Sequence, residues 1–167
     1  MMFLICSKDP KEAVDYLIDN TNKLFCFKQL MELGQLICSC GISSVFKPIS
    51  RGKEIQAWIL ENPHYAYNYF LCLLLWCMEH VNLKQETVEK FNRIIRNLQS
   101  YINKESLLPA NICTNVHNLY PKTIVFRYKK EYAGHTKYKS NEVIPIEEGI
   151  KEYKEYLKWK MQEKVLA

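Results

Sequence analysis

Apolar positions recur along most of the chain at intervals of three and four residues, the spacing that places side chains on one face of a helix. This pattern predicts six helices with suitable ends: Asp9-Pro10 opens the first and Gly41 closes the second. The helices are predicted after residue 9, at about 23–40, 53–60 and 64–81, after Asn82, and at about 146–164.

Two stretches have the composition of strands. Residues 1–6 form a short apolar run, and residues 123–128 are rich in β-branched and aromatic residues. The second stretch lies within residues 105–145, where prolines and a glycine interrupt every periodic pattern. We therefore predict a mainly α, single-domain bundle of about six helices over residues 1–167, with a short N-terminal strand and one further strand in an irregular C-terminal segment.

The composition is that of one folded domain. The chain has 167 residues, 48% hydrophobic and 25% charged, which excludes collagen-like, low-complexity and wholly disordered classes. Seven cysteines, several of them inside apolar runs, argue against a disulfide scaffold. The apolar stretches 1–6 and 69–78 are too short to cross a bilayer, which takes roughly 20 residues. We expect a reduced, cytoplasmic protein with no membrane partner.

The net charge of +5 comes from one part of the chain. Residues 122–140, called the basic segment below, contain six bases and one acid, so the remainder of the chain is neutral. Charge gathered in this way attracts phosphate groups, whereas scattered charge serves mainly solubility.

The basic segment also carries aromatic side chains. Arg127, Lys129, Lys130 and Tyr132 combine positive charge with a ring, which favours single-stranded nucleic acid or a nucleotide over the groove of a duplex. The alternative is a solvated basic loop whose tyrosines anchor it to the core.

A candidate catalytic site lies on the helix predicted at 23–40. Lys28, Glu32 and Gln35 follow one another at spacings of four and three residues, which puts them on one face. Glu32 would act as the acid or base, Lys28 would hold a phosphate or carbonyl oxygen, and Gln35 would bind substrate. Asn68 joins them if its helix packs against this one. The alternatives are a solvent-exposed face for the first three residues, and an Asn68 that braces a neighbouring helix.

The sequence predicts no metal site and no cofactor. Its cysteines and histidines lack the paired spacing of zinc ligands. It also lacks a glycine-rich phosphate loop and the motifs of serine or cysteine nucleophiles. Most familiar enzyme classes therefore have no support in the sequence.

Several short motifs occur in the order found in one family of viral proteins. They are Ser7-Lys8-Asp9-Pro10, the Lys-x-x-x-Glu-x-x-Gln of residues 28–35, Phe46-Lys47-Pro48, Trp58, Asn68-Tyr69, and Tyr153, Tyr156 and Trp159. Together they resemble a family of small proteins of T4-like phages and other large DNA viruses. The resemblance implies a viral origin and a nucleotide or nucleic-acid setting, and it adds Lys47 to the candidate substrate-binding residues.

The chain departs from this family at two places. It has Lys23-Leu24-Phe25 where the family has Asp-Lys-His, and Lys53-Glu54 where the family has His-Pro. Any function that the family assigns to these histidines is therefore not carried over to this chain.

Two functions follow as hypotheses. In the first, the protein is a hydrolase that acts on a nucleotide or nucleic-acid base, with cleavage of an N-glycosidic bond as the reaction and Glu32 stabilising the positive charge that develops on the sugar. In the second, it is a non-enzymatic viral protein whose basic segment binds nucleic acid or a host factor.

Overall fold

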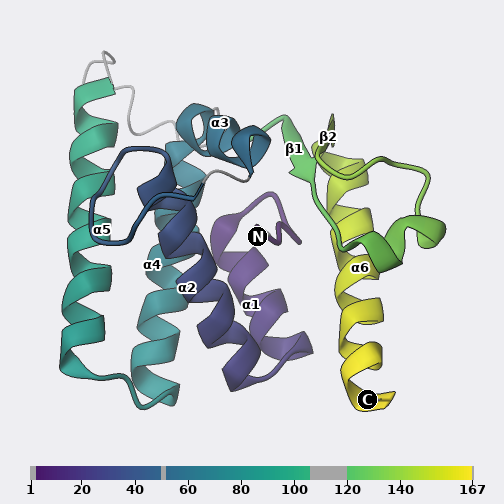
Figure 1. Ribbon diagram of the computed structural model, residues 1–167, viewed down its shortest axis with the longest axis horizontal. Coiled ribbons are helices and arrows are strands. Elements are labelled where there is room, and N and C mark those ends of the chain that lie inside the picture. Colours follow the sequence, from purple (N-terminus) through teal and green to yellow (C-terminus); the bar gives the residue numbers. More distant parts are fainter. Residues whose placement is uncertain (1–2, 50–51, 106–119, 167) are drawn as a thin grey trace.

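A computed structural model describes residues 3–49, 52–105 and 120–166. The first two residues of the predicted N-terminal strand and residues 106–119 of the predicted irregular segment lie outside this part of the chain. Within it the protein is mainly helical, with one small sheet, as the apolar periodicity predicts (Figure 1).

The six predicted helices are all present, with ends close to the predicted ones. They are α1 (Pro10–Asn20), α2 (Lys23–Ser39), α3 (Lys53–Glu61), α4 (Pro63–His80), α5 (Gln85–Glu105) and α6 (Ile146–Leu166). Local chemistry explains several ends. The Asn22 side chain accepts a hydrogen bond from the backbone N–H of Phe25 at 2.9 Å and so caps α2. Gly41 takes the left-handed conformation (φ +82°) just after α2, and Pro63 is the first residue of α4.

Helix α4 lies at the centre of the helical part and contacts α1, α2, α3 and α5. Its buried side carries large rings that pack edge to face with rings from other elements. The Phe3 ring lies 4.8 Å from that of Tyr69 and 5.5 Å from that of Trp58, and the rings of Phe70 and Phe91 are 5.8 Å apart. The dense apolar run 69–78 is therefore a core helix.

The N-terminal segment is buried but belongs to no sheet. Residues 3–6 are at most 2% exposed, as expected of a core strand, yet they pair with no described strand. Instead, the Tyr69 hydroxyl donates to the Leu4 carbonyl at 3.0 Å, and the Tyr65 hydroxyl donates to the Ser7 carbonyl at 2.6 Å. The expectation of an N-terminal strand is corrected for these residues, because tyrosines of α4 take the place of a partner strand.

The sheet consists of two antiparallel strands in the C-terminal third. Strand β1 (Thr123–Phe126) pairs with β2 (Glu142–Pro145), with Ile124 opposite Ile144. Between them the chain forms a short 3-10 helix, η2 (Lys130–His135). The strand predicted at 123–128 is confirmed over its first four residues, whereas β2 and η2 are too short to leave a periodic signal.

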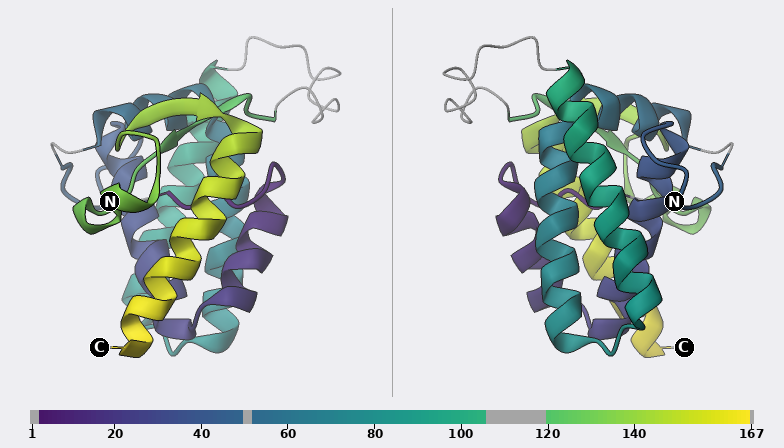
Figure 2. Two further views of the ribbon diagram at one scale, coloured as in Figure 1. Left: turned by 90° about the vertical axis from the view of Figure 1, so that its right-hand side faces the viewer. Right: turned by 90° about the vertical axis from the view of Figure 1, so that its left-hand side faces the viewer.

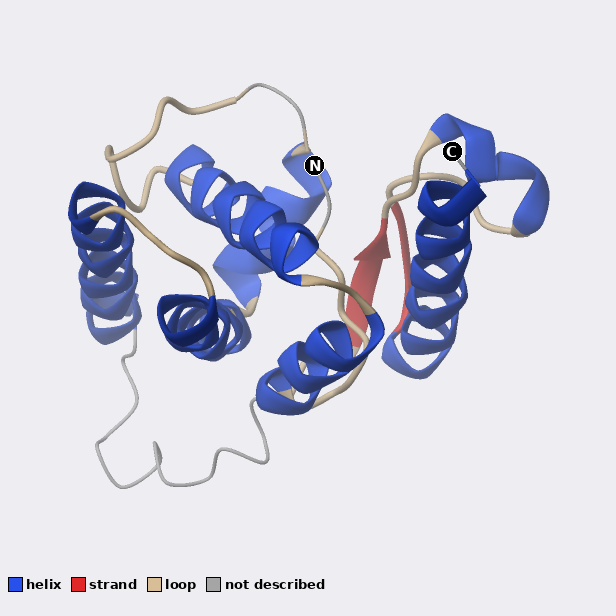
Figure 3. Ribbon diagram, turned by 90° about the horizontal axis from the view of Figure 1, so that it is seen from below, coloured by secondary structure: helices blue, strands red, loops and turns tan. Residues whose placement is uncertain are grey.

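Helix α6 covers this sheet and contacts both strands. Figure 3 shows the two strands beside the helix on the right, which is α6, and the side views of Figure 2 place α6 and α5 on opposite sides of the molecule. The Lys154 ammonium lies 4.9 Å from the centre of the Tyr16 ring of α1, which links α6 to the helical part. No helix in the described residues has the length and apolar character needed to cross a membrane.

The approach of α6 to β1 requires glycine at position 149. A Cβ atom built there would lie 1.9 Å from Cδ1 and 2.2 Å from Cγ1 of Ile124, which is itself fully buried. We predict that Gly149→Ala lowers the free energy of unfolding by about 1–3 kcal/mol through overpacking, despite the gain in helix propensity. Urea unfolding measures the change.

Gly134→Ala is the matched control, because a Cβ at this position in η2 meets no atom within 4 Å. It should leave the unfolding midpoint nearly unchanged. Equal midpoints for the two variants would contradict the close packing of α6 on β1.

Candidate functional site

The polar face predicted on α2 exists but does not form an enclosed site. The Lys28 side chain is exposed, and those of Glu32 and Gln35 are partly buried. Lys28 and Glu32 form no ion pair within 4.0 Å in the described structure. None of the three lines any of the three cavities described below, which lie beside η2 and α6, between the α2–α3 loop and α5, and along α5.

Asn68 lies apart from this face. It is exposed, and its side-chain amide donates to the His64 carbonyl one turn back on its own helix, at 2.9 Å. The residues that follow it on the same face of α4, Leu75 and Glu79, are also exposed, so this is the outer face of the helix. Asn68 and Glu32 share none of these three cavities, so their convergence on one site stays a prediction.

The polar side chain that α2 buries is Gln29, which is only 2% exposed. It lies among the buried residues Phe25, Cys26, Leu30 and Leu33. Gln29 does not belong to the polar stripe of residues 28, 32 and 35, so helical spacing does not single it out.

The basic segment presents five lysines to solvent. Lys122, Lys129, Lys130, Lys137 and Lys139 are all exposed. No carboxylate of the described residues lies within 4.0 Å of any of their ammonium groups. Their positive charge is therefore not neutralised by close ion pairs.

Two tyrosines of α6 hold the backbone that carries these lysines. The Tyr153 hydroxyl donates to the Val125 carbonyl and accepts from the Arg127 N–H at 3.1 Å. The Tyr156 hydroxyl accepts from the Lys129 N–H at 3.0 Å. Both tyrosines are 0% exposed, and burial raises the pKa of the Tyr153 hydroxyl above its usual value. The start of the basic segment is thus fixed to α6 through its backbone.

The tyrosines of the basic segment point into the structure. Tyr132 is 3% exposed, and its ring contacts those of Tyr156 at 4.8 Å and Trp159 at 5.2 Å. Burial, followed by the negative charges of Glu152 and Glu155, raises the pKa of Tyr132. The aromatic ring expected to stack on a base is therefore an anchor, as in the alternative reading of this segment.

Tyr128 and Tyr138 hold the segment from its other side. The Tyr128 hydroxyl donates to the Tyr138 carbonyl at 2.6 Å, and the Tyr138 hydroxyl donates to a carboxylate oxygen of Glu148. The hydrogen bond to Glu148 raises the pKa of Tyr138 to about 12. Five tyrosines, four through their hydroxyls and Tyr132 through its ring, therefore hold residues 122–140 together with the β1–β2 pairing.

Arg127 differs from the lysines because part of its guanidinium is buried. Its Nη1 atom is inaccessible to solvent and has no hydrogen-bond partner. A Cβ at Gly52, the residue before α3, would lie 2.9 Å from this atom. The backbone of Gly52 is left-handed (φ +85°), so glycine meets two requirements at this position. Lys47 lies in the loop before it and is exposed.

A small cavity lies between η2 and α6. It has a volume of about 410 Å³ and is lined by Tyr132, His135, Glu155, Lys158, Trp159 and Gln162. The His135 ring stacks on the Tyr132 ring, and its centre lies 5.9 Å from that of Trp159. The aromatic rings that line this cavity therefore pack against one another. This arrangement stabilises η2 on α6.

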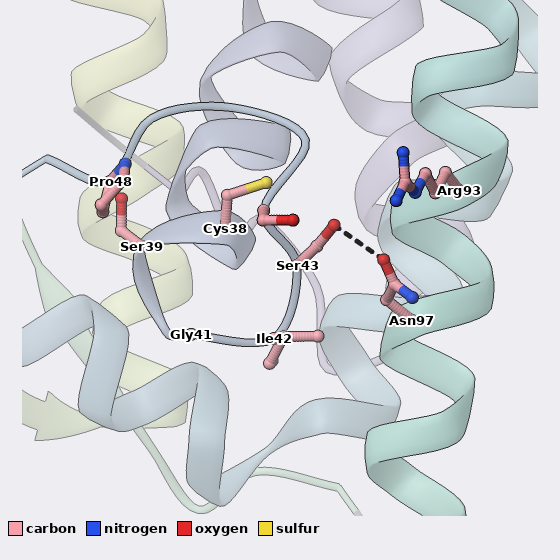
Figure 4. A pocket seen from close by; sticks show the side chains of 9 residues that line it. Cys38, Ser39, Gly41, Ile42, Ser43, Pro48, Arg93 and Asn97 are labelled. Atoms are coloured by element: carbon pink, nitrogen blue, oxygen red, sulfur yellow. Dashed lines mark hydrogen bonds between the residues drawn. The ribbon is translucent and has the colours of Figure 1, made fainter.

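A second cavity lies between the loop that follows α2 and helix α5 (Figure 4). It has a volume of about 480 Å³ and is lined by Cys38, Ser39, Gly41, Ile42, Ser43, Ser44, Pro48, Arg93 and Asn97. The Ser43 hydroxyl donates to Oδ1 of Asn97 at 2.8 Å. The sequence does not point to this cavity, because Arg93 and Asn97 lie on the polar face of α5, which has the pattern of an ordinary amphipathic helix.

No cluster of three or more His, Cys, Asp or Glu side chains that could hold a metal occurs in the described part of the chain. The six described cysteines are free, and burial raises the pKa of the Cys6 and Cys77 thiols to about 12. Comparison with protein-family models, with curated proteins and with solved structures finds no match to this chain.

The tyrosine hydroxyls of α6 can be tested by removing one of them. Tyr153→Phe leaves the Val125 carbonyl and the Arg127 N–H without this partner in a buried place, which should cost about 1–3 kcal/mol of unfolding free energy. Amide exchange at Arg127 should also become faster. Tyr67→Phe is the control, because no hydrogen bond of its hydroxyl occurs in the described structure. Similar losses in both variants would contradict the anchoring by Tyr153.

The contact between Gly52 and Arg127 gives another test. Gly52→Ala and Gly41→Ala both place alanine at a positive φ, at a cost of about 1–2 kcal/mol, but only the first also crowds a guanidinium. We predict that Gly52→Ala is the more destabilising in thermal unfolding. In an Arg127→Ala background the two substitutions should have equal effects, and a difference that persists there would rule out the contact as its cause.

Proposed function

We propose that the protein binds single-stranded nucleic acid through the phosphate backbone, using the lysines of the basic segment. The observation that carries this proposal is the set of five exposed lysines without close carboxylates, on a backbone held by Tyr153 and Tyr156. Lysines on a fixed backbone bind phosphates at a lower entropic cost than the same lysines on a disordered tail.

The buried tyrosines support phosphate contacts over base stacking. Tyr132 offers no free ring face, because Tyr156, Trp159 and His135 surround it. Arg127 is also partly buried, with one guanidinium nitrogen inaccessible to solvent beside Gly52. Binding would therefore depend on charge and salt, with little dependence on base sequence.

Hydrolysis of a nucleotide has less support. Lys28 and Asn68 are both exposed, and Glu32 lines none of the three cavities described above. A general acid or base needs reach to a bound substrate, and no described cavity offers this to Glu32. The proposal is therefore for binding alone. A viral origin and a place in the cytoplasm of a host cell remain part of it, on the motif resemblance.

The experiment measures binding of a fluorescent oligothymidylate by anisotropy over a range of salt concentrations. Contact with up to five phosphates predicts a slope of log K against log salt no steeper than about −3.5. Lys129→Gln/Lys130→Gln should weaken binding at least about tenfold at low salt and reduce the slope by about 1.4.

The matched control is Lys11→Gln/Lys84→Gln, which removes the same charge from exposed positions outside the basic segment. It should change affinity by less than about threefold. No binding by the wild type at low salt, or equal losses in the two double variants, would refute the basic segment as a nucleic-acid site.

A further inference from the structure

The cavity beside α5 has the side chains of an anion site. Arg93 and Asn97 project from successive turns of α5 toward the loop, and Ser43 faces them from the loop (Figure 4). Ser44, the next residue of the loop, also lines the cavity. Its volume of about 480 Å³ lies within the range of small-molecule sites. The cavity lies apart from the basic segment, and the inference drawn from it does not depend on the proposed function.

The charge of the cavity is positive. Among its nine lining residues Arg93 is the only charged one. No carboxylate in the described part of the chain lies within 4.0 Å of its guanidinium. The neighbouring hollow of about 500 Å³, which shares Ser44 and Arg93, does contain Glu86 and Glu89, but Glu86 pairs with Lys90 at 3.5 Å.

The hydrogen bonds of the lining side chains leave several donors free. Ser39 is satisfied, since its hydroxyl donates to the Gln35 carbonyl at 2.8 Å and accepts from the Ile49 N–H at 3.0 Å. Ser43 occupies Oδ1 of Asn97, which leaves the Nδ2 amide group of Asn97 as a donor. The Ser44 hydroxyl and the Arg93 guanidinium also have no hydrogen-bond partner in the described structure. A site with spare donors and a positive charge suits an oxyanion.

The donors come from two sides. Arg93 and Asn97 are four residues apart on one face of α5, and Ser44 belongs to the opposite wall. A phosphate monoester has three terminal oxygens that point in different directions, so it can accept from all three side chains at once. The remaining surface, formed by Ile42, Pro48 and the buried Cys38, is less polar and suits the body of a small molecule.

We propose that the cavity between the α2–α3 loop and α5 binds a small phosphate monoester, whose phosphate is held by Arg93, Asn97 and Ser44. Ser43 acts as a positioning residue, because its hydrogen bond to Oδ1 fixes the orientation of the Asn97 amide. The loop is held in place at Ser39 through its bond to the Ile49 N–H.

Calorimetric titration at low ionic strength tests the proposal, with ribose 5-phosphate as the probe and ribose as the control ligand. Ribose 5-phosphate should bind the wild type, and ribose should not bind at the same concentration. Arg93→Gln should weaken binding at least about tenfold, whereas Arg96→Gln, which removes a charge one turn away outside this cavity, should change it less than about threefold.

Asn97→Asp provides a second variant that preserves the fold. It keeps the oxygen that accepts from Ser43 but replaces the free amide with negative charge, so it should abolish binding of ribose 5-phosphate. The melting temperature of each variant, measured without ligand, should match that of the wild type. Lys129→Gln/Lys130→Gln should retain sugar-phosphate binding, which separates this site from the basic segment.

Three results would overturn the proposal: no binding of ribose 5-phosphate by the wild type at millimolar concentration, equal losses in Arg93→Gln and Arg96→Gln, or unchanged binding in Asn97→Asp. The first would show that the cavity takes no phosphate monoester. The second would show that only the general charge of α5 matters.

Discussion

Buried tyrosine hydroxyls bound to backbone groups hold together the parts of this protein that lack a long helix or sheet ladder. Tyr65 and Tyr69 of α4 bind carbonyls of the N-terminal segment, and Tyr153 and Tyr156 of α6 bind the chain around the end of β1. A buried carbonyl without a partner costs free energy comparable to a lost hydrogen bond. These hydroxyls allow irregular backbone to pass through the core. The tyrosines of α4 and α6 therefore have a structural role.

The hydrogen bonds of these tyrosines to the backbone also determine which side chains of the basic segment are exposed to solvent. The Tyr132 ring faces inward, and the close approach of Gly149 to Ile124 brings α6 near enough for Tyr153 to reach the strand. The lysine side chains are left outside. Their charge also acts apart from that of Arg93, since α5 and α6 lie on opposite sides of the molecule and screening at physiological salt acts within about 8 Å (Figure 2).

Periodicity alone was enough to predict the helices, because each buries a continuous apolar face that recurs at helical spacing. It was not enough for β2 and η2, of four and six residues, or for the path of residues 3–6. An apolar run of this length has the same pattern whether a strand or a tyrosine hydroxyl satisfies its carbonyls. The direction of Tyr132 likewise depends on Trp159 and Tyr156, which are distant in sequence.

The α2 polar stripe shows why a site is harder to predict than a helix. Lys28, Glu32, Gln35 and Ser39 follow one another at spacings of four, three and four residues, so the sequence places all four on one face. Of these four residues, Ser39 is the one that lines the cavity between the loop and α5. Spacing along one helix determines which side chains share a face. The second wall of a cavity comes from residues that are distant in the sequence, here Arg93 and Asn97. The position of that wall determines which residues of the stripe can contact a ligand.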